Sequence, residues 1–182
     1  MTVTRKREQN YWPLVLVKSR CTKLEGNKIV VSDLIEIHTD GSCKVNPGPG
    51  GWGVVILYPG GEERHISGCN ETGHTTNNRM EVTAVIKGLL AIPVGSKVKV
   101  YTDSTYVLGQ MGWDWRGNGP LRRKNKRNTN HDILEQLDQL VAERNVFWEH
   151  EEGHAGNVYN ELADKLANKA ADVGGGIDER KN

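Results

Sequence analysis

Apolar and polar residues alternate along most of the region from residue 34 to residue 69. Alternating runs bounded by glycine and proline are typical of strands, and they predict strands at 34–40, 52–58 and 62–69. Pro59-Gly60-Gly61 separates the last two runs and predicts a hairpin turn. We therefore expect three antiparallel strands before the first helix.

After residue 75 the apolar residues recur three and four positions apart. This spacing predicts a helix with the apolar positions Val82, Val85, Ile86, Leu89 and Leu90, capped by a side chain of the Thr75–Asn78 cluster. A strand at 97–102, a short helix capped by Ser104, a helix at 133–141, a strand at 145–149 and a last helix at 162–170 complete the pattern. Because strands and helices alternate here, we expect a parallel crossover.

Both ends of the chain fall outside this pattern. Its length of 182 residues suits one domain, which we place at 33–171. Residues 1–32 form an N-terminal extension of undetermined role, with seven basic residues, two acidic residues and an apolar run at 14–17 that resembles a further strand. Gly174-Gly175-Gly176 begins a polar stretch, so we expect residues 172–182 to be a flexible tail.

Composition narrows the class of protein. Hydrophobic residues make up 36% and charged residues 26%, which is typical of a globular domain. The net charge of +1 gives no global sign of nucleic-acid binding, so any such sign must be local. Cys21, Cys43 and Cys69 form no C-x-x-C pair, and the N-terminus lacks the apolar stretch of a signal peptide or membrane span. We expect a cytoplasmic protein that does not bind membranes.

Four acidic residues stand at the edges of the predicted elements. Asp40 and Asp103 close strands, Glu81 lies near the start of a helix, and Asp164 lies on the last helix. Carboxylates brought together repel each other, so a fold that gathers them needs a cation. Mg²⁺ prefers oxygen ligands, and two ions about 4 Å apart can assist both the attacking water and the leaving oxygen of a phosphoryl transfer.

Five motifs, in this order and at this spacing, resemble the ribonuclease H type 1 family. They are Asp40-Gly41-Ser42-Cys43, the segment 46–53, Thr75–Glu81, Thr102-Asp103-Ser104-x-Tyr106-Val107, and the segment 153–164. The resemblance covers residues 34–171. It implies an α/β fold of the ribonuclease H type: a five-stranded mixed sheet, with three antiparallel strands and then parallel strands, flanked by helices.

The resemblance also implies a chemistry. It makes Asp40, Glu81, Asp103 and Asp164 catalytic ligands of two Mg²⁺ ions, with Mn²⁺ as a substitute. It places His154 in a mobile loop, where the histidine assists proton transfer or product release, in agreement with an ordinary pKa of about 6.5. The implied enzyme is a monomer that cuts the RNA strand of RNA/DNA hybrids and leaves 5′-phosphate and 3′-hydroxyl ends.

Candidate substrate contacts follow from the same resemblance. A protein distinguishes RNA from DNA through the 2′-hydroxyl and the shape of the minor groove. The candidates are Cys43, Asn46, Thr76, Asn77, Arg79, Asn160, Arg122, Arg123 and Lys124. The alternative for Asn46 is that Asn46-Pro47-Gly48 simply forms a tight turn.

A basic segment at 116–127 contains six basic residues and no acidic residue. It resembles the basic handle of the family, which would bind phosphates and make affinity depend on salt. The alternative is a solvated charged loop. Thr105 departs from the family pattern, which often has glutamine at this position.

Three other functions are weighed against this one. His150-Glu151-Glu152-Gly153-His154 matches the zinc protease pattern H-E-x-x-H, but that pattern needs a helix, and the residues before it are strand-like. Gly48-x-Gly50-x-x-Gly53 matches a dinucleotide-binding fingerprint, but a strand follows it in place of a helix. A non-catalytic hybrid-binding module would be expected to lack one of the four acidic residues, and all four are present.

Overall fold

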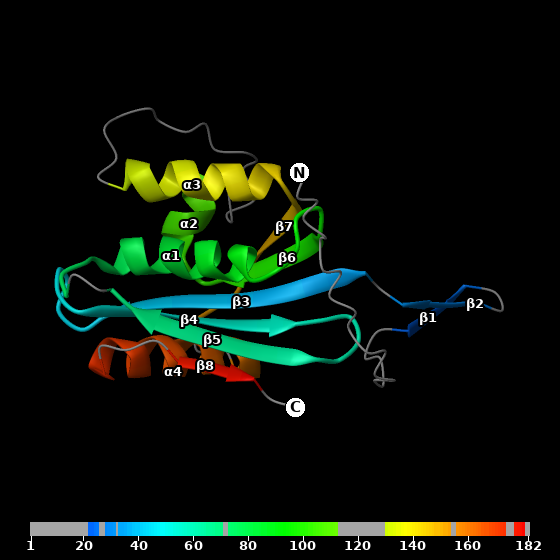
Figure 1. The fold of residues 1–182 in the computed structure, drawn as a ribbon, viewed down its shortest axis with the longest axis horizontal. Helices are drawn as coiled ribbons and strands as arrows, with labels where there is room; N and C mark the ends of the chain where they lie inside the picture. Colours follow the sequence, from blue (N-terminus) through cyan, green and yellow to red (C-terminus); the bar gives the residue numbers. More distant parts are fainter. Residues whose placement is uncertain are drawn as a thin grey trace, which may run out of the picture.

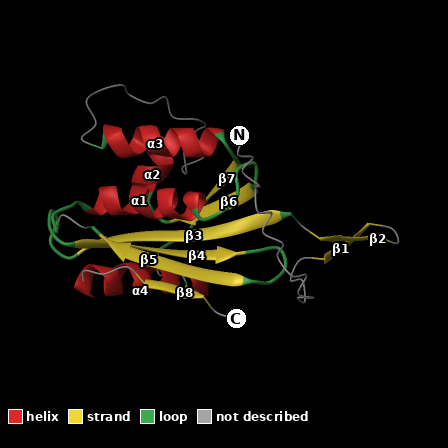
Figure 2. Cartoon of the chain, viewed as in Figure 1, coloured by secondary structure: helices red, strands yellow, loops and turns green. Residues whose placement is uncertain are grey.

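The structure is a computed structural model that describes residues 22–25, 28–31, 33–70, 73–112, 130–153, 156–173 and 177–180. A mixed sheet forms its centre, and helices cover both faces (Figure 1). Helices α1 (Asn77–Leu90), α2 (Thr105–Gln110) and α3 (His131–Ala142) lie on one side, and α4 (Val158–Val173) lies on the other. Figure 2 shows the same three layers coloured by secondary structure.

All five predicted strands are present, in the predicted arrangement. They are β3 (Leu34–Cys43), β4 (Gly50–Leu57), β5 (Glu63–Cys69), β6 (Lys97–Thr102) and β7 (Asn145–His150). β3, β4 and β5 pair antiparallel, whereas β6 pairs parallel with both β3 and β7. The crossovers through α1 and through α2 and α3 make these parallel pairings possible.

Apolar positions fill two layers between sheet and helices. On the α1 side the buried cluster includes Ile37, Val54, Val85, Leu89 and Val100. On the α4 side, Val55 of β4 packs against Ala163 and Leu166. The predicted caps are confirmed, because Thr76 Oγ1 accepts from Arg79 N at 3.3 Å and Ser104 Oγ accepts from Val107 N at 3.1 Å.

The strand that carries Asp40 is longer than predicted. The sequence pattern ends this strand at Asp40, but β3 continues to Cys43, and Asp40 lies opposite Gly53 of β4. Gly41 does not break the strand, because residues 41–43 pair with β4, which satisfies their backbone groups. Asp40 therefore lies inside the strand, paired with β4, instead of ending it.

Two glycines permit the close approach of helices to the sheet. A Cβ at Gly41 would lie 2.2 Å from the backbone nitrogen of Glu81 in α1, and a Cβ at Gly53 would lie 2.2 Å from the carbonyl oxygen of Ala163 in α4. Both distances are shorter than any ordinary contact, so only glycine fits without a shift of the backbone. Gly41 thus brings the start of α1 against the strand that carries Asp40.

Both chain ends contain strands that the sequence pattern did not predict. In the N-terminal extension, β1 (Thr22–Glu25) and β2 (Lys28–Val31) pair as an antiparallel hairpin, and the apolar run at 14–17 lies outside the described residues. At the C-terminus α4 continues to Val173, and β8 (Ile177–Arg180) pairs antiparallel with β5. The expected flexible tail at 172–182 thus contributes to a helix and to a sixth strand, which covers the otherwise free edge of β5.

In the part of the chain that the structure describes, no helix combines the length and apolar character needed to cross a bilayer.

Candidate active site

The four predicted carboxylates line one pocket with a volume of about 410 Å³. The pocket lies where β3, the start of α1, the junction between β6 and α2, and α4 meet. Its lining residues are Asp40, Gly41, Ser42, Asn77, Asn78, Glu81, Asp103, Ser104, Thr105, Tyr106, Asn160, Glu161, Asp164 and Asn168. Residues as far apart in sequence as Asp40 and Asp164 therefore share one site.

Strand register brings Asp103 level with Asp40. His38 of β3 lies opposite Tyr101 of β6 in the parallel pair, and two further residues along each chain lead to Asp40 and Asp103. Residues in equivalent positions on adjacent parallel strands lie side by side. The two carboxyl groups therefore meet at the same end of the sheet.

Asp40 has the most perturbed acid–base behaviour of the set. Burial and then the charge of Asp103 raise the pKa of Asp40 to about 8 from an ordinary value of 3.8, and the carboxyl of Asp164 adds to this rise. The backbone N–H of Gly41 donates to Oδ1 at 2.8 Å and opposes it. Without a cation, Asp40 therefore keeps its proton to a much higher pH than an ordinary aspartate does.

Glu81 accepts hydrogen bonds at both carboxyl oxygens. Asn77 Nδ2 donates to Oε1 at 2.8 Å, and Ser104 Oγ donates to Oε2 at 2.5 Å. Burial raises the pKa of Glu81, whereas these two hydrogen bonds oppose the rise. Ser104 thus caps α2 and holds a carboxylate of α1 at the same time, a contact that sequence reasoning missed.

Asparagines on α4 hold the two remaining carboxylates. Burial raises the pKa of Asp103, and a hydrogen bond from the buried side chain of Asn160 opposes that rise. Asn168 Nδ2 donates to Asp164 Oδ1 at 2.6 Å. Sequence reasoning missed Asn168 as well, although its place four residues after Asp164 puts both side chains on one helix face.

The charge of the pocket is one-sided. Of the described residues that line it, five are Asp or Glu, and none is Lys, Arg or His. Such a set of oxygen donors matches the preference of Mg²⁺ for carboxylates, carbonyls and water. Within the described ranges, no group of three or more His, Cys, Asp or Glu side chains is yet arranged closely enough to hold one metal ion.

Four predicted substrate contacts lie in two places: Cys43 and Asn46 at the end of β3 and in the segment that follows it, and Thr76 and Asn77 at the start of α1. Asn46 Oδ1 accepts from the backbone N–H of Asn77 at 3.4 Å, so the two asparagines lie together. Asn77 also lines the pocket. Cys43 Sγ donates to the carbonyl of Val45 at 3.1 Å. Thr76 caps α1 through its hydroxyl, which is a structural role.

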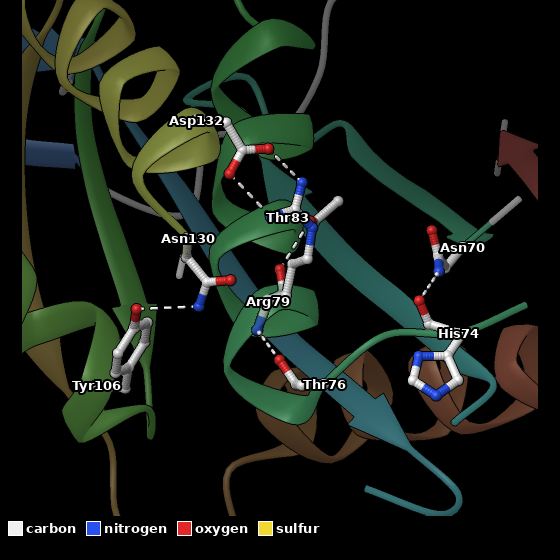
Figure 3. Close-up of polar contacts among 8 residues, drawn as sticks. All are labelled: Asn70, His74, Thr76, Arg79, Thr83, Tyr106, Asn130 and Asp132. Carbon is white, nitrogen blue, oxygen red and sulfur yellow. Dashed lines mark hydrogen bonds and ion pairs between the residues drawn. The ribbon is translucent and has the colours of Figure 1, made fainter. Parts of the chain in front are cut away.

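Arg79 has a partner within the protein. Its Nη1 and Nη2 donate to Oδ1 and Oδ2 of Asp132 at 2.9 and 2.5 Å, and the pair joins α1 to α3 (Figure 3). The same view shows Asn130 Nδ2 donating to Tyr106 Oη at 3.0 Å, which joins the start of α3 to α2. The guanidinium of Arg79 therefore has a structural role in addition to the predicted contact with substrate.

Four predicted site residues lie outside the described residues: His154, Arg122, Arg123 and Lys124. The chain just before His154 does reach the pocket, since a Cβ at Gly153 would lie 3.1 Å from Asp103 Oδ2.

The zinc protease interpretation does not fit the structure. His150 is the last residue of β7, so the segment does not begin in a helix. Glu151 is buried and interacts with His38 Nδ1 at 3.3 Å, and it also accepts from Asn157 Nδ2. The glutamate is thus part of a buried polar network that connects β3 to the start of α4.

Comparison with known proteins identifies the family. A sequence model described as RNase H matches residues 32–172. Ribonuclease H of Methylobacillus flagellatus is 46% identical over 144 residues, which cover 78% of this chain and 93% of that protein. Ribonuclease H of Pseudomonas putida is 43% identical over 145 residues, which cover 78% of this chain and 96% of that protein.

Solved structures agree with the sequence relatives. LC9-RNase H1, a type 1 RNase H with the type 2 active-site motif, superposes with a TM-score of 0.64 at 33% identity and covers 80% of this chain and 77% of that one. LC11-RNase H1 in complex with RNA/DNA hybrid gives a TM-score of 0.60 at 31% identity and covers 76% and 96%. The predicted fold and resemblance are confirmed. The chain belongs to the ribonuclease H family and is a ribonuclease.

Proposed function

We propose that this ribonuclease is an endonuclease that hydrolyses the RNA strand of RNA/DNA hybrids with the help of divalent metal ions. One observation carries the proposal: Asp40, Glu81, Asp103 and Asp164 line a single pocket that has no cationic side chain among its described residues. The relative LC11-RNase H1, which has the same fold, was solved in complex with RNA/DNA hybrid. An acidic pocket beside a polynucleotide needs cations, because phosphates and carboxylates repel each other.

The residues of the pocket fit Mg²⁺, with Mn²⁺ as a substitute. Asp40, Glu81, Asp103 and Asp164 would hold two ions through carboxylate oxygens, the donors that these cations prefer. When bound, the ions supply Lewis acidity and offset the negative charge that develops on the phosphate. The raised pKa of Asp40 fits this role, because the carboxyl group must exchange its proton for a cation.

Other side chains orient the carboxylates and the substrate. Asn77 and Ser104 hold Glu81, and Asn160 holds Asp103. In the proposed reaction, water attacks the scissile phosphorus and the bond to the 3′-oxygen breaks, which leaves 5′-phosphate and 3′-hydroxyl ends. His154, on the segment that follows Gly153, would carry protons between the site and solvent.

Recognition of the hybrid is assigned to two regions. Cys43, Asn46 and Asn77 would face the minor groove, where an amide can donate to or accept from a 2′-hydroxyl without reading base sequence. Arg122, Arg123 and Lys124 would neutralise phosphates. We further propose that the enzyme acts as a monomer in the cytoplasm, away from membranes.

A cleavage assay tests the proposal. RNA labelled at its 5′ end is supplied in an RNA/DNA hybrid and in duplex RNA, and duplex DNA is supplied as a third substrate. Each substrate is incubated with Mg²⁺ and, separately, with EDTA. We expect that, of the three substrates, only the hybrid is cleaved, and only with Mg²⁺. A ligase should be able to join the products after they anneal to a DNA splint, because they carry 5′-phosphate and 3′-hydroxyl ends.

Two variants sharpen the assay. Asp40→Asn should abolish cleavage while hybrid binding stays largely intact, because the change removes a metal ligand. Asp132→Asn is the matched control, since Asp132 is an exposed aspartate on α3 that does not line the pocket. Full activity of Asp40→Asn, or undiminished cleavage in EDTA, contradicts the proposal.

A further inference from the structure

A short chain of hydrogen bonds crosses from β3 to α4 at the wall of the pocket. Ser42 Oγ donates to Asn168 Oδ1 at 2.7 Å, and Asn168 Nδ2 donates to Asp164 Oδ1 at 2.6 Å. Asn168 Nδ2 also lies 3.0 Å from the backbone carbonyl of Asp164. Ser42, Asn168 and Asp164 are all half-buried, and all three line the pocket.

The direction of this chain follows from the chemistry of its members. An ionised carboxylate only accepts hydrogen bonds, and so does a carbonyl oxygen, so the NH₂ end of the Asn168 amide must face Asp164. The oxygen end then faces Ser42, whose hydroxyl can donate to it. If the amide were reversed, its oxygen would lie against two other oxygens, and Ser42 would have to accept in place of donating.

We propose that Asn168 is a positioning residue for Asp164 and that Ser42 fixes the orientation of the Asn168 amide. Asn168 acts through Asp164 and touches neither reacting atoms nor the cation. This inference rests on the proposed function, in which Asp164 is a metal ligand. It extends that function by assigning roles to two neutral residues on different elements.

The geometry gives a reason for such a residue at this place. Asp164 lies on α4, on the opposite side of the sheet from α1, which carries Glu81. The hydrogen bonds of Asn168 restrict the rotation of the Asp164 carboxylate, and the link to Ser42 ties it to the strand of Asp40. Partners that orient metal-binding carboxylates typically contribute about 10-fold to 100-fold in metal affinity or activity.

The test combines metal binding with kinetics. Asn168→Leu keeps the approximate size of the side chain and removes its hydrogen bonds to Ser42 and Asp164. Asn168→Ala serves as a second variant if leucine impairs folding. Mg²⁺ affinity is measured by calorimetry on the protein without hybrid. We expect it to fall about 10-fold or more. With hybrid, kcat at a fixed low Mg²⁺ concentration should fall, KM for the hybrid should stay unchanged, and added Mg²⁺ should restore kcat.

Ser42→Ala and the double variant distinguish positioning from direct contact. If Ser42 acts through Asn168, Ser42→Ala lowers Mg²⁺ affinity less than Asn168→Leu does. The double variant then binds Mg²⁺ as tightly as Asn168→Leu alone. Lys165→Ala, at an exposed position of α4, is the control and should leave Mg²⁺ affinity unchanged.

Two results overturn the inference. Unchanged Mg²⁺ affinity in both Asn168 variants removes the role of Asn168, and additive losses show that Ser42 acts on its own. In either case, a wild-type protein that still binds Mg²⁺ and cleaves hybrid leaves the proposed function standing. A wild-type protein that does neither removes both.

Discussion

The charge of Asp103 is, after burial, the largest cause of the raised pKa of Asp40. The two residues are level with each other because β3 and β6 are parallel and in register. In the absence of a cation, this arrangement costs folding free energy whenever both carboxyls are ionised. The carboxylates that suit the site to a cation therefore lower the stability of the metal-free protein, and this makes the free energy of unfolding depend on pH.

Stability without metal should fall as pH rises. The pKa of Asp40 is about 8 in the folded chain and 3.8 in its ordinary state, so between these values the folded state holds a proton that the unfolded state has lost. The free energy of unfolding then decreases from about pH 4 to about pH 8. Asp40→Asn should remove much of this decrease and raise the melting temperature at pH 8. Thermal unfolding in EDTA from pH 5 to pH 8.5 measures it.

Asp132 provides a control of opposite sign. Its hydrogen bond with Arg79 lowers the pKa of Asp132 to about 2. The stabilisation from this group is present above pH 3.8 and is lost as pH falls toward 2. Asp132→Asn should therefore leave the decrease between pH 5 and pH 8.5 unchanged. If the free energy of unfolding of Asp40→Asn decreased over this pH range as much as that of the wild type, Asp40 would not be the source of the decrease.

Replacing Arg79 distinguishes a structural role from substrate binding. The pair with Asp132 is partly exposed, and such pairs contribute about 0.2 to 1 kcal/mol. Arg79→Ala should lower the free energy of unfolding by up to this amount, and Asp132→Ala should have a similar effect that is not additive. Chemical denaturation measures both. If Arg79 also binds substrate, as its place in the resemblance implies, KM for the hybrid rises in Arg79→Ala and stays constant in Asp132→Ala.

Gly41 should tolerate no side chain. A Cβ there would meet the backbone of Glu81 at 2.2 Å, so Gly41→Ala must push α1 away from β3. Forced overpacking of this kind costs about 1 to 3 kcal/mol, and it also displaces Glu81 from the pocket. We expect lower stability together with a lower kcat. Gly60→Ala is the matched control, because a Cβ at Gly60 meets nothing within 4 Å. Equal stability of the two variants would contradict the packing described here.

The basic segment at 116–127 lies outside the described residues, and its function stays a prediction. Replacing Arg122, Arg123 and Lys124 with Ala should raise KM for the hybrid and flatten its dependence on salt, because fewer counterions are released on binding. The value of kcat should change little. Steady-state kinetics across a series of KCl concentrations tests this. An unchanged KM would mean that the segment is only a solvated loop.

The sequence allowed the strands, the helices and the four carboxylates to be predicted, because each depends on local pattern or on a motif. The alternation of Val98 and Val100 predicted β6 with its observed bounds, and Ser104 was recognised as a cap from its place before a helix. Such features are set by a few neighbouring residues.

Other features depend on contacts between distant segments. The pairing of Gly41–Cys43 with β4, the ion pair of Arg79 with Asp132, and the link from Ser42 to Asn168 all join residues far apart in sequence. Gly41 has no local preference for a strand, so only the pairing with β4 decides its structure. The β8 strand escaped prediction for the same reason.

The most direct test of the central claim is a crystal of the protein soaked in Mn²⁺, with anomalous diffraction measured near the manganese absorption edge. We predict anomalous peaks within coordination distance of Asp40, Glu81, Asp103 and Asp164, and weaker or absent peaks in Asp40→Asn. Peaks elsewhere, with none in this pocket, would contradict the assignment of these four carboxylates as the metal ligands of the enzyme.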